Sequence, residues 1–169
     1  ADPKLIEALY KASQAGVKIR LSVRGICCLR PGVKGLSENI SVFSVVDRYL
    51  EHARIFRFSN GGEPRLFLAS ADWMPRNLDR RIELMVPVED EAGKEKLSQI
   101  LKTCLSDTVQ AWRLKPSGVY ERRADEARKK SVHSQLQFQQ KAEARAAASR
   151  QKQAPVFEPQ RPTEKKKAP

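Results

Sequence analysis

The sequence predicts an α/β fold. Near the N-terminus, a proline-initiated amphipathic pattern ends at a glycine and is followed at once by a run of alternating apolar residues. Further along, short apolar runs separated by turn residues precede a second stretch with helical periodicity. A helix, a glycine and a strand in this order form the step from which α/β folds are built. We therefore expect a mixed β-sheet flanked by helices.

The first helix is expected to begin at Asp2 and Pro3 and to end at Gly16. An aspartate side chain can accept the free N–H groups at a helix start, and proline suits the first helical position. Glycine adopts the left-handed conformation that commonly ends a helix. Residues 17–23 then alternate between apolar and polar side chains, which predicts a strand.

Further strands are predicted at residues 40–46, 54–58, 65–69, 81–88 and 109–114. The run 81–88 is mostly apolar, so we expect it in the centre of its sheet. A loop rich in glycine and proline covers 25–39, one helical turn is expected over 47–51, and Asn-Gly-Gly at 60–62 predicts a hairpin-type turn. Residues 89–106 begin with acids and carry an apolar face, which predicts an amphipathic helix.

Charge and composition divide the chain in two. The net charge is +12, which favours polyanionic partners such as nucleic acid, nucleotides or polyphosphate. Residues 121–169 hold thirteen Lys or Arg against six Asp or Glu. We expect a domain over 1–121 and a basic low-complexity tail over 122–169, partly helical up to about residue 152 or disordered.

The cysteines and the hydropathy argue against several classes of protein. The three cysteines include no CxxC pair, which argues against a disulfide framework or a zinc site. No apolar run approaches the roughly 18 residues of a membrane-spanning helix. These features predict a cytoplasmic protein without a transmembrane segment.

The main candidate for chemistry is His52, one of only two histidines. It precedes a predicted strand and lies among Arg48, Arg54 and Arg57. A single histidine is most often a surface or capping residue. Among arginines, however, it can serve phosphoryl transfer as nucleophile or as general acid and base.

Two other features of the sequence are candidates for the same site as His52. Arg24 precedes Gly25 where the first strand should end, and ligands bind at such strand ends in open α/β sheets. Arg24 is either a solvated residue or a bidentate phosphate ligand. The polar string 70–77, with Arg80, Arg81 and Glu83 after it, is either a capped loop or a second part of the site.

These residues resemble a known family. The blocks that carry the resemblance are Gly16-Val17-Lys18-Ile19, Val23-Arg24-Gly25-Ile26-Cys27, Asp47-Arg48-Tyr49-Leu50-Glu51-His52, Asn60-Gly61-Gly62 and Ser70-Ala71-Asp72-Trp73-Met74-Pro75-Arg76-Asn77-Leu78-Asp79-Arg80-Arg81. Their order and spacing across about residues 4–120 resemble the C-terminal domain of bacterial polyphosphate kinase, type 1. The resemblance implies a phospholipase-D-like domain with a mixed β-sheet flanked by helices.

The phospholipase-D pattern itself is only partly matched. His52-Ala53-Arg54 stands where that superfamily has His-x-Lys, and Ser70-Ala71-Asp72 stands near its Ser-x-Asn, with Glu83 downstream. Arginine in place of lysine and aspartate in place of asparagine put phosphodiester cleavage in doubt. The same changes suit transfer of a phosphoryl group to a phosphate acceptor.

The resemblance also implies an activity. It is the reversible transfer of the terminal phosphate of ATP to polyphosphate, with Mg²⁺, through a phosphohistidine on a preceding domain. Arg24 and His52 would bind ATP and phosphate, and His52 would be the catalytic second histidine, acting as acid or base or by stabilising the leaving phosphate. The Mg²⁺ ligands are expected outside this chain.

The implied partners are ATP, ADP, polyphosphate, the N-terminal domains of the same enzyme, and further copies of the full-length enzyme in a homo-oligomer. The expected location is the cytoplasm, or the membrane as part of a complex, and the chain alone is expected to be inactive. Two alternatives remain. One is a phospholipase-D-like phosphodiesterase or nuclease made from two half-sites, and the other is a non-enzymatic module that binds polyanions through its tail.

Overall fold

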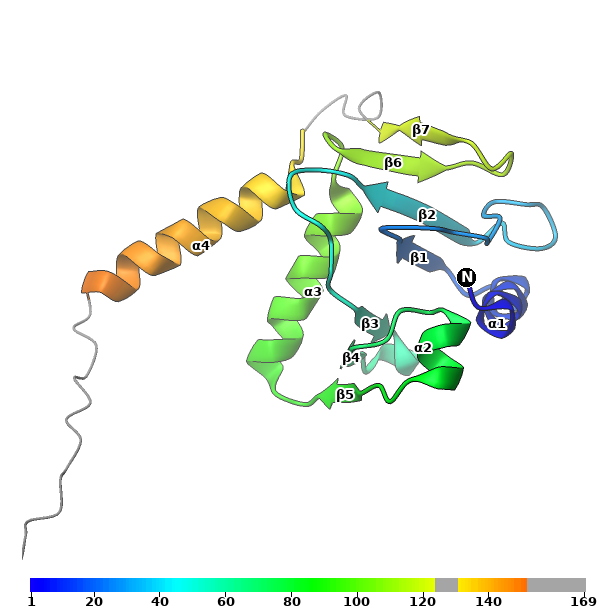
Figure 1. Ribbon diagram of the computed structural model, residues 1–169, viewed down its shortest axis with the longest axis horizontal. Coiled ribbons are helices and arrows are strands. Elements are labelled where there is room, and N and C mark those ends of the chain that lie inside the picture. Colours follow the sequence, from blue (N-terminus) through cyan, green and yellow to red (C-terminus); the bar gives the residue numbers. More distant parts are fainter. Residues whose placement is uncertain (124–130, 152–169) are drawn as a thin grey trace, which may run out of the picture. The chain divides into compact units, whose positions relative to one another are not determined.

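The protein is described by a computed structural model, in which residues 1–123 and 131–151 are described (Figure 1). It divides into two compact units, Ala1–Gln135 and Leu136–Pro169. The first unit thus continues past residue 121, where the sequence suggested a boundary. Within the described residues, no helix is long and apolar enough to cross a membrane.

The first unit contains a four-stranded mixed sheet (Figure 1). Its strands, in spatial order, are β1 (Ile19–Ser22), β2 (Ile40–Val45), β6 (Ala111–Leu114) and β7 (Tyr120–Arg122). The pair β1 and β2 is parallel, and the other pairs are antiparallel. The mixed sheet predicted from the sequence is therefore present, and the short strand β7 was not predicted.

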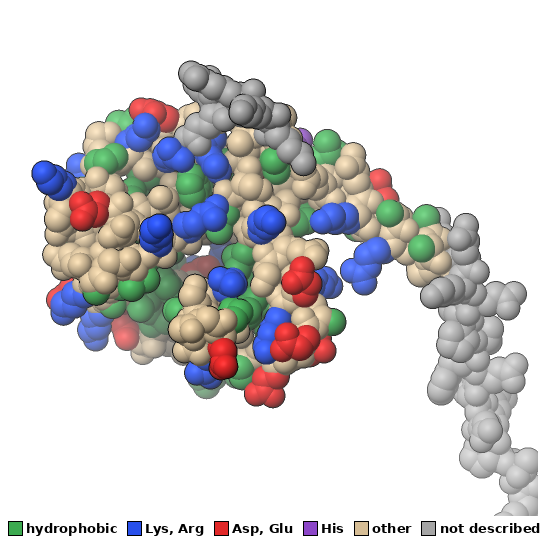
Figure 2. All heavy atoms as spheres, turned by 180° about the vertical axis from the view of Figure 1, so that it is seen from behind, with side chains coloured by type: hydrophobic (Ala, Val, Ile, Leu, Met, Phe, Trp, Pro, Cys, Tyr) green, Lys and Arg blue, Asp and Glu red, His purple; other side chains and the backbone are tan. Residues whose placement is uncertain are grey.

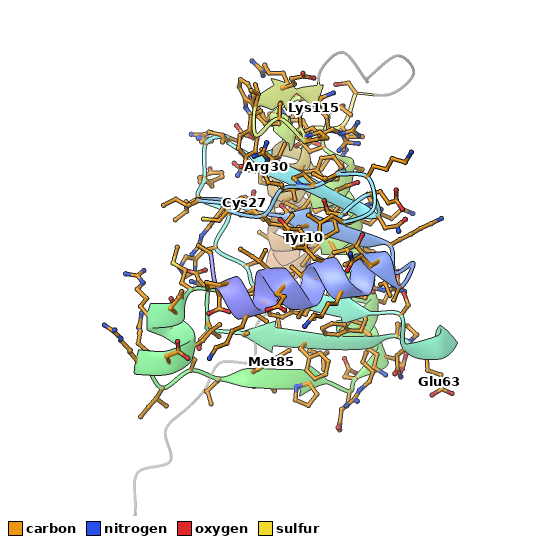
Figure 3. All side chains as sticks on the ribbon, turned by 90° about the vertical axis from the view of Figure 1, so that its right-hand side faces the viewer. Tyr10, Cys27, Arg30, Glu63, Met85 and Lys115 are labelled. Carbon is orange, nitrogen blue, oxygen red and sulfur yellow. The ribbon has the colours of Figure 1, made fainter. Side chains whose placement is uncertain are left out.

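Helix α1 (Pro3–Gln14) packs against one face of this sheet. Its side chains Ile6, Leu9 and Tyr10 contact a buried core, whose members are Leu29, Ile40, Val42 and Leu114. Figure 3 shows Tyr10 beneath the loop that carries Cys27 and Arg30, and its hydroxyl accepts the Arg30 N–H at 2.8 Å. The helix therefore fixes both the sheet and the loop after β1.

Helix α3 (Glu91–Ser106) contacts β1 and β3. Side chains alternate along β1, so Arg20 points away from the face that holds α1. The Arg20 guanidinium donates to the carbonyl of Leu105 in the last turn of α3, at 3.3 Å. Since a helix C-terminus carries partial negative charge, this contact stabilises the helix end.

A second sheet, with three antiparallel strands, carries the other half of the unit. Its strands are β3 (Ile55–Phe58), β4 (Arg65–Ala69) and β5 (Met85–Val88), in that order. The sequence predicted a mixed β-sheet, and the structure adds this second, antiparallel sheet. The central position expected for 81–88 was wrong, because β5 is an edge strand. Pro87 of β5 has no backbone N–H group to donate to a further strand, so it is tolerated at the edge of a sheet. Figure 3 labels Met85 on the same edge strand.

The helix boundaries predicted from local rules agree with the structure. The Asp2 carboxylate accepts the Leu5 N–H at 2.9 Å, Pro3 begins α1, and Gly16 follows its end with a φ of 87°. The turn at 60–62 forms as the 3₁₀ helix η1 (Asn60–Gly62), in which both glycines have positive φ. The short helix α2 (Pro75–Arg80), by contrast, was not predicted.

Two helical predictions need correction. Residues 46–54 form no helix or strand, because Tyr49 pairs its backbone N–H and carbonyl with the side chain of Gln135. Of the tail expected to be partly helical up to about residue 152, the described residues contain the helix α4 (Ser134–Gln151), while Arg122 at its start belongs to β7. Residues 124–130 and 152–169 lie outside the described residues.

Candidate functional site

A pocket of about 400 Å³ lies where the ends of the two sheets meet. It is lined by Arg24, His52, Arg54, Ser70, Asp72, Arg76, Asn77, Arg81 and Glu83. Arg24 follows β1, His52 and Arg54 precede β3, Ser70 and Asp72 follow β4, and the others lie on α2 or between α2 and β5. The fold thus brings together all three features that the sequence singled out.

Asp72 organises one wall of the pocket. Its two carboxylate oxygens each lie 2.9 Å from Nη2 of Arg24, and Oδ1 also accepts from Nε of Arg54 at 3.1 Å. Burial alone would raise the pKa of Asp72, but the hydrogen bond from Arg54 and the charges of Arg24 and Arg54 outweigh it and lower that pKa. Asp72 therefore stays ionised and holds two guanidinium groups in place.

Arg24 is held from a second side. Its Nη1 donates to the carbonyl of Glu51 at 3.1 Å, immediately before His52 in the chain. Arg24 therefore links the end of β1 to the loop that carries the histidine. The side chain is three-quarters buried, so its orientation is set by the protein and not by solvent.

His52 is exposed and lies beside Arg54. The Arg54 Nη1 group is 3.0 Å from Nδ1 of the His52 ring and 3.0 Å from the His52 carbonyl. The same Nη1 group also lies 3.3 Å from Nε2 of the ring. The arrangement holds the imidazole against the Arg54 side chain at the rim of the pocket.

Glu83 organises a second group of lining residues. It accepts a hydrogen bond from the Ser70 hydroxyl and one from Asn77 Nδ2 at 2.7 Å, and Arg81 lies 3.6 Å away. The hydrogen bonds from Ser70 and Asn77 lower the pKa of Glu83. Asn77 is only 3% exposed, and its Oδ1 has no hydrogen-bond partner among the described residues.

The pocket carries a net positive charge. Four arginines face two carboxylates, which gives 4 − 2 = +2 with a neutral histidine. Basic side chains are also spread across the molecular face seen in Figure 2, with acidic ones interspersed. Guanidinium groups bind phosphate oxygens in a bidentate manner, so this lining suits a phosphate-bearing anion.

The described residues contain no cluster of three or more His, Cys, Asp or Glu that could hold a metal ion. Asp72 and Glu83 are already engaged with arginine, serine and asparagine donors. The pocket therefore does not fit a Mg²⁺ site built from the described residues alone.

Some residues that the sequence suggested for the site do not line the pocket. Arg48 stacks over the ring of Tyr49, with 5.5 Å from its guanidinium carbon to the ring centre, and neither Arg57 nor Arg80 lines the pocket. Sequence reasoning also missed the bridging role of Asp72. No local signal could have revealed it, because Asp72 and its partner Arg24 are 48 positions apart.

Fold and site together define an α/β domain with an arginine-rich, histidine-containing pocket at the strand ends. The family model described as polyphosphate kinase C-terminal domain 2 matches residues 1–135. The chain belongs to this family. The catalytic and binding roles of Arg24 and His52 remain predictions.

Individual relatives agree with this assignment. Polyphosphate kinase of Rhodopirellula baltica is 60% identical over 121 residues, which cover 72% of this chain and 14% of that protein. The polyphosphate kinase of Synechocystis sp. is 56% identical over 137 residues, or 81% of this chain and 19% of that protein. The crystal structure of polyphosphate kinase from Porphyromonas gingivalis matches with a TM-score of 0.77 and 42% identity, over 87% of this chain and 22% of that one. The chain thus spans about a fifth or less of these relatives.

Proposed function

We propose that this chain is the C-terminal catalytic domain of a polyphosphate kinase, which reversibly transfers the terminal phosphate of ATP to polyphosphate. The observation that carries the proposal is the cationic pocket in which Asp72 orients Arg24 and Arg54 beside His52. Membership of the family and the names of the relatives support the same reaction.

The proposed chemistry needs mainly positive charge in fixed positions. A transferring phosphoryl group spreads negative charge over its three outer oxygens, and preoriented donors stabilise that charge. The guanidinium groups of Arg24 and Arg54 are such donors, because Asp72 fixes them before any ligand binds. Their role is to bind the phosphates of ATP or polyphosphate.

His52 is proposed as the second histidine of a two-sided site. In the first step, the bond between the terminal phosphorus of ATP and its bridging oxygen breaks, a phosphorus–nitrogen bond forms on a histidine of a preceding domain, and ADP leaves. A terminal oxygen of polyphosphate then takes the phosphoryl group from that nitrogen. His52 would assist by moving a proton or by stabilising the leaving phosphate. Any Mg²⁺ would be held by residues outside this chain together with the substrate phosphates.

Binding of inorganic tripolyphosphate or ATP to the chain, measured by calorimetry at two salt concentrations, tests the role of Arg24. We expect Arg24→Ala to weaken binding by roughly 10- to 100-fold, because a charge-assisted contact contributes about 1.5–3 kcal/mol. The matched control is Arg80→Ala, which removes the same charge outside the pocket. Equal losses in the two variants would show nonspecific attraction, and absence of binding to the unaltered chain would refute the proposal.

A second experiment addresses turnover. We expect the isolated chain to show little or no ATP-dependent synthesis of polyphosphate, because the phosphorylated histidine belongs to another domain. Addition of the N-terminal region of the same enzyme should restore synthesis, and His52→Ala should abolish it. With labelled ATP, the label should appear on the added region. A label on this chain alone would overturn the assignment of His52.

A further inference from the structure

The loop that carries His52 has little support of its own. It runs from the end of β2 to the start of β3, without helix or strand, and thereby connects the two sheets. Its side chains are mostly exposed, with Leu50 at 73% and Tyr49 at 53%. Apolar burial therefore cannot fix this loop, and its position must depend on polar contacts.

Gln135 supplies three of these contacts. Its Nε2 donates to the Tyr49 carbonyl at 2.7 Å and to the Glu51 side chain at 2.8 Å, and its Oε1 accepts the Tyr49 N–H at 2.8 Å. The amide thus pairs with both backbone groups of one loop residue, as a neighbouring strand would. Gln135 is only 7% exposed, so water competes little for these bonds.

A second contact holds the beginning of the loop. Nε2 of His133 lies 2.6 Å from Oδ2 of Asp47, whose Oδ1 accepts the N–H of Arg48 at 2.8 Å. Residues 132–135, here called the clasp, therefore contact the loop at Asp47 and again at residues 49 and 51.

The clasp is itself anchored in the interior. Ser134 is fully buried and donates both its N–H and its hydroxyl to Oδ2 of Asp107, at 2.7 and 2.6 Å. Val132 exchanges two hydrogen bonds with Thr108. Because Ser134 begins α4, the Asp107 carboxylate also faces the positive end of that helix. The clasp is thus tied to buried polar groups, and it contacts a loop that apolar burial does not fix.

We infer that the clasp is a positioning element for the pocket, and that Gln135 is its main positioning residue. Gln135 fixes Glu51, the Glu51 carbonyl accepts from Arg24, and His52 is the next residue in the chain. The inference that the clasp orders His52 stands on these contacts alone. Its expected effect on phosphate binding rests on the proposed function.

The test compares Gln135→Ala with the control Gln140→Ala, which removes an exposed amide further along α4. NMR measures hydrogen exchange at the Tyr49 N–H and the ring signals of His52, and calorimetry measures affinity for tripolyphosphate. In Gln135→Ala we expect exchange at Tyr49 to rise about tenfold or more, while amides of β2 keep their protection. The His52 ring signals should shift, and affinity should fall about threefold or more because the competent loop is less populated. The control should change none of these.

A double substitution separates loss of loop positioning from general destabilisation of the fold. Gln135→Glu keeps the acceptor for the Tyr49 N–H but loses both donated bonds and repels Glu51. Adding Glu51→Gln restores a donor and acceptor between the two side chains, so the His52 signals should return toward those of the unaltered chain.

The outcomes are distinguishable from those of the proposed function. Unchanged Tyr49 exchange or unchanged His52 signals in Gln135→Ala would overturn the inference. Lost protection with unaltered tripolyphosphate affinity would reduce the clasp to a structural contact and overturn its role in the pocket. If the unaltered chain binds no tripolyphosphate, the proposed function fails, and the His52 signals still decide whether the clasp orders the loop.

Discussion

The substitution Asp107→Asn offers a sharp test of how the first unit is held together. Asp107 is fully buried, and its carboxylate accepts five hydrogen bonds. Three come from backbone N–H groups to Oδ1, and two come from Ser134 to Oδ2. Asparagine has almost the same shape, so it can keep the three bonds to oxygen. Its NH₂ group, however, would replace the oxygen that accepts from the Ser134 N–H, so two hydrogen-bond donors would face each other.

The expected cost follows from these contacts. A buried N–H without a partner costs about 1–3 kcal/mol, and hydrogen bonds to a neutral amide are weaker than those to a carboxylate. Removing the charge also removes its desolvation penalty, which offsets part of the loss. We expect a loss of about 2–4 kcal/mol in the free energy of unfolding. For a domain of this size, the corresponding fall in Tm is roughly 6–15 °C.

The pH dependence gives an independent check. Burial alone would raise the pKa of Asp107, but hydrogen bonds from Ser134 and from the backbone of Gln110 and Val109 outweigh it and lower that pKa. A lowered pKa in the folded state means that the stabilisation is fully present above the unfolded value, about 3.9, and is lost as pH falls through the folded value. The difference between the unaltered chain and Asp107→Asn should therefore be largest near neutral pH and shrink below about pH 4.

Urea unfolding followed by tryptophan fluorescence, at pH 7 and at several acidic values, measures this difference. Asp79→Asn is the matched control, because Asp79 is exposed on α2, and we expect a change within about 0.5 kcal/mol. A stability of Asp107→Asn within 0.5 kcal/mol of the unaltered chain at pH 7 would refute the reasoning. A difference that stays constant down to pH 2 would refute the part played by the charge.

Two further predictions concern local features. Gly62 has a φ of 109°, and a Cβ added there would meet open space. Gly62→Ala should therefore lower the free energy of unfolding by about 1 kcal/mol through backbone strain alone. Gly25→Ala, at a position without positive φ, is the control and should be near neutral in the same unfolding assay. Burial raises the pKa of Cys104 to about 11, whereas Cys28 is exposed. Alkylation at pH 8 followed by mass spectrometry should therefore label Cys28 first; faster labelling of Cys104 in the folded chain would contradict its burial.

The sequence by itself determined those elements whose signals are local. Asp2, Pro3 and Gly16 mark the ends of α1 because capping depends on residues within one turn of the helix. Asp90 likewise begins α3 by accepting the Gly93 N–H at 2.6 Å. Most strands could be predicted because apolar alternation records which side of a strand is buried. The residue types of the site were also visible, since arginine and histidine in polar strings indicate anion chemistry.

Only the tertiary structure decided how these pieces combine. An apolar run at residues 81–88 predicts a strand, but its edge position and its membership of a second sheet depend on pairing with β4, which no local pattern records. The pocket depends on contacts over longer distances still. Asp72 meets Arg24 across 48 positions, and Gln135 meets Tyr49 across 86. Hydrogen bonds of this kind form only once both sheets are in place, so the residue types that line the pocket could be predicted from the sequence while their geometry could not.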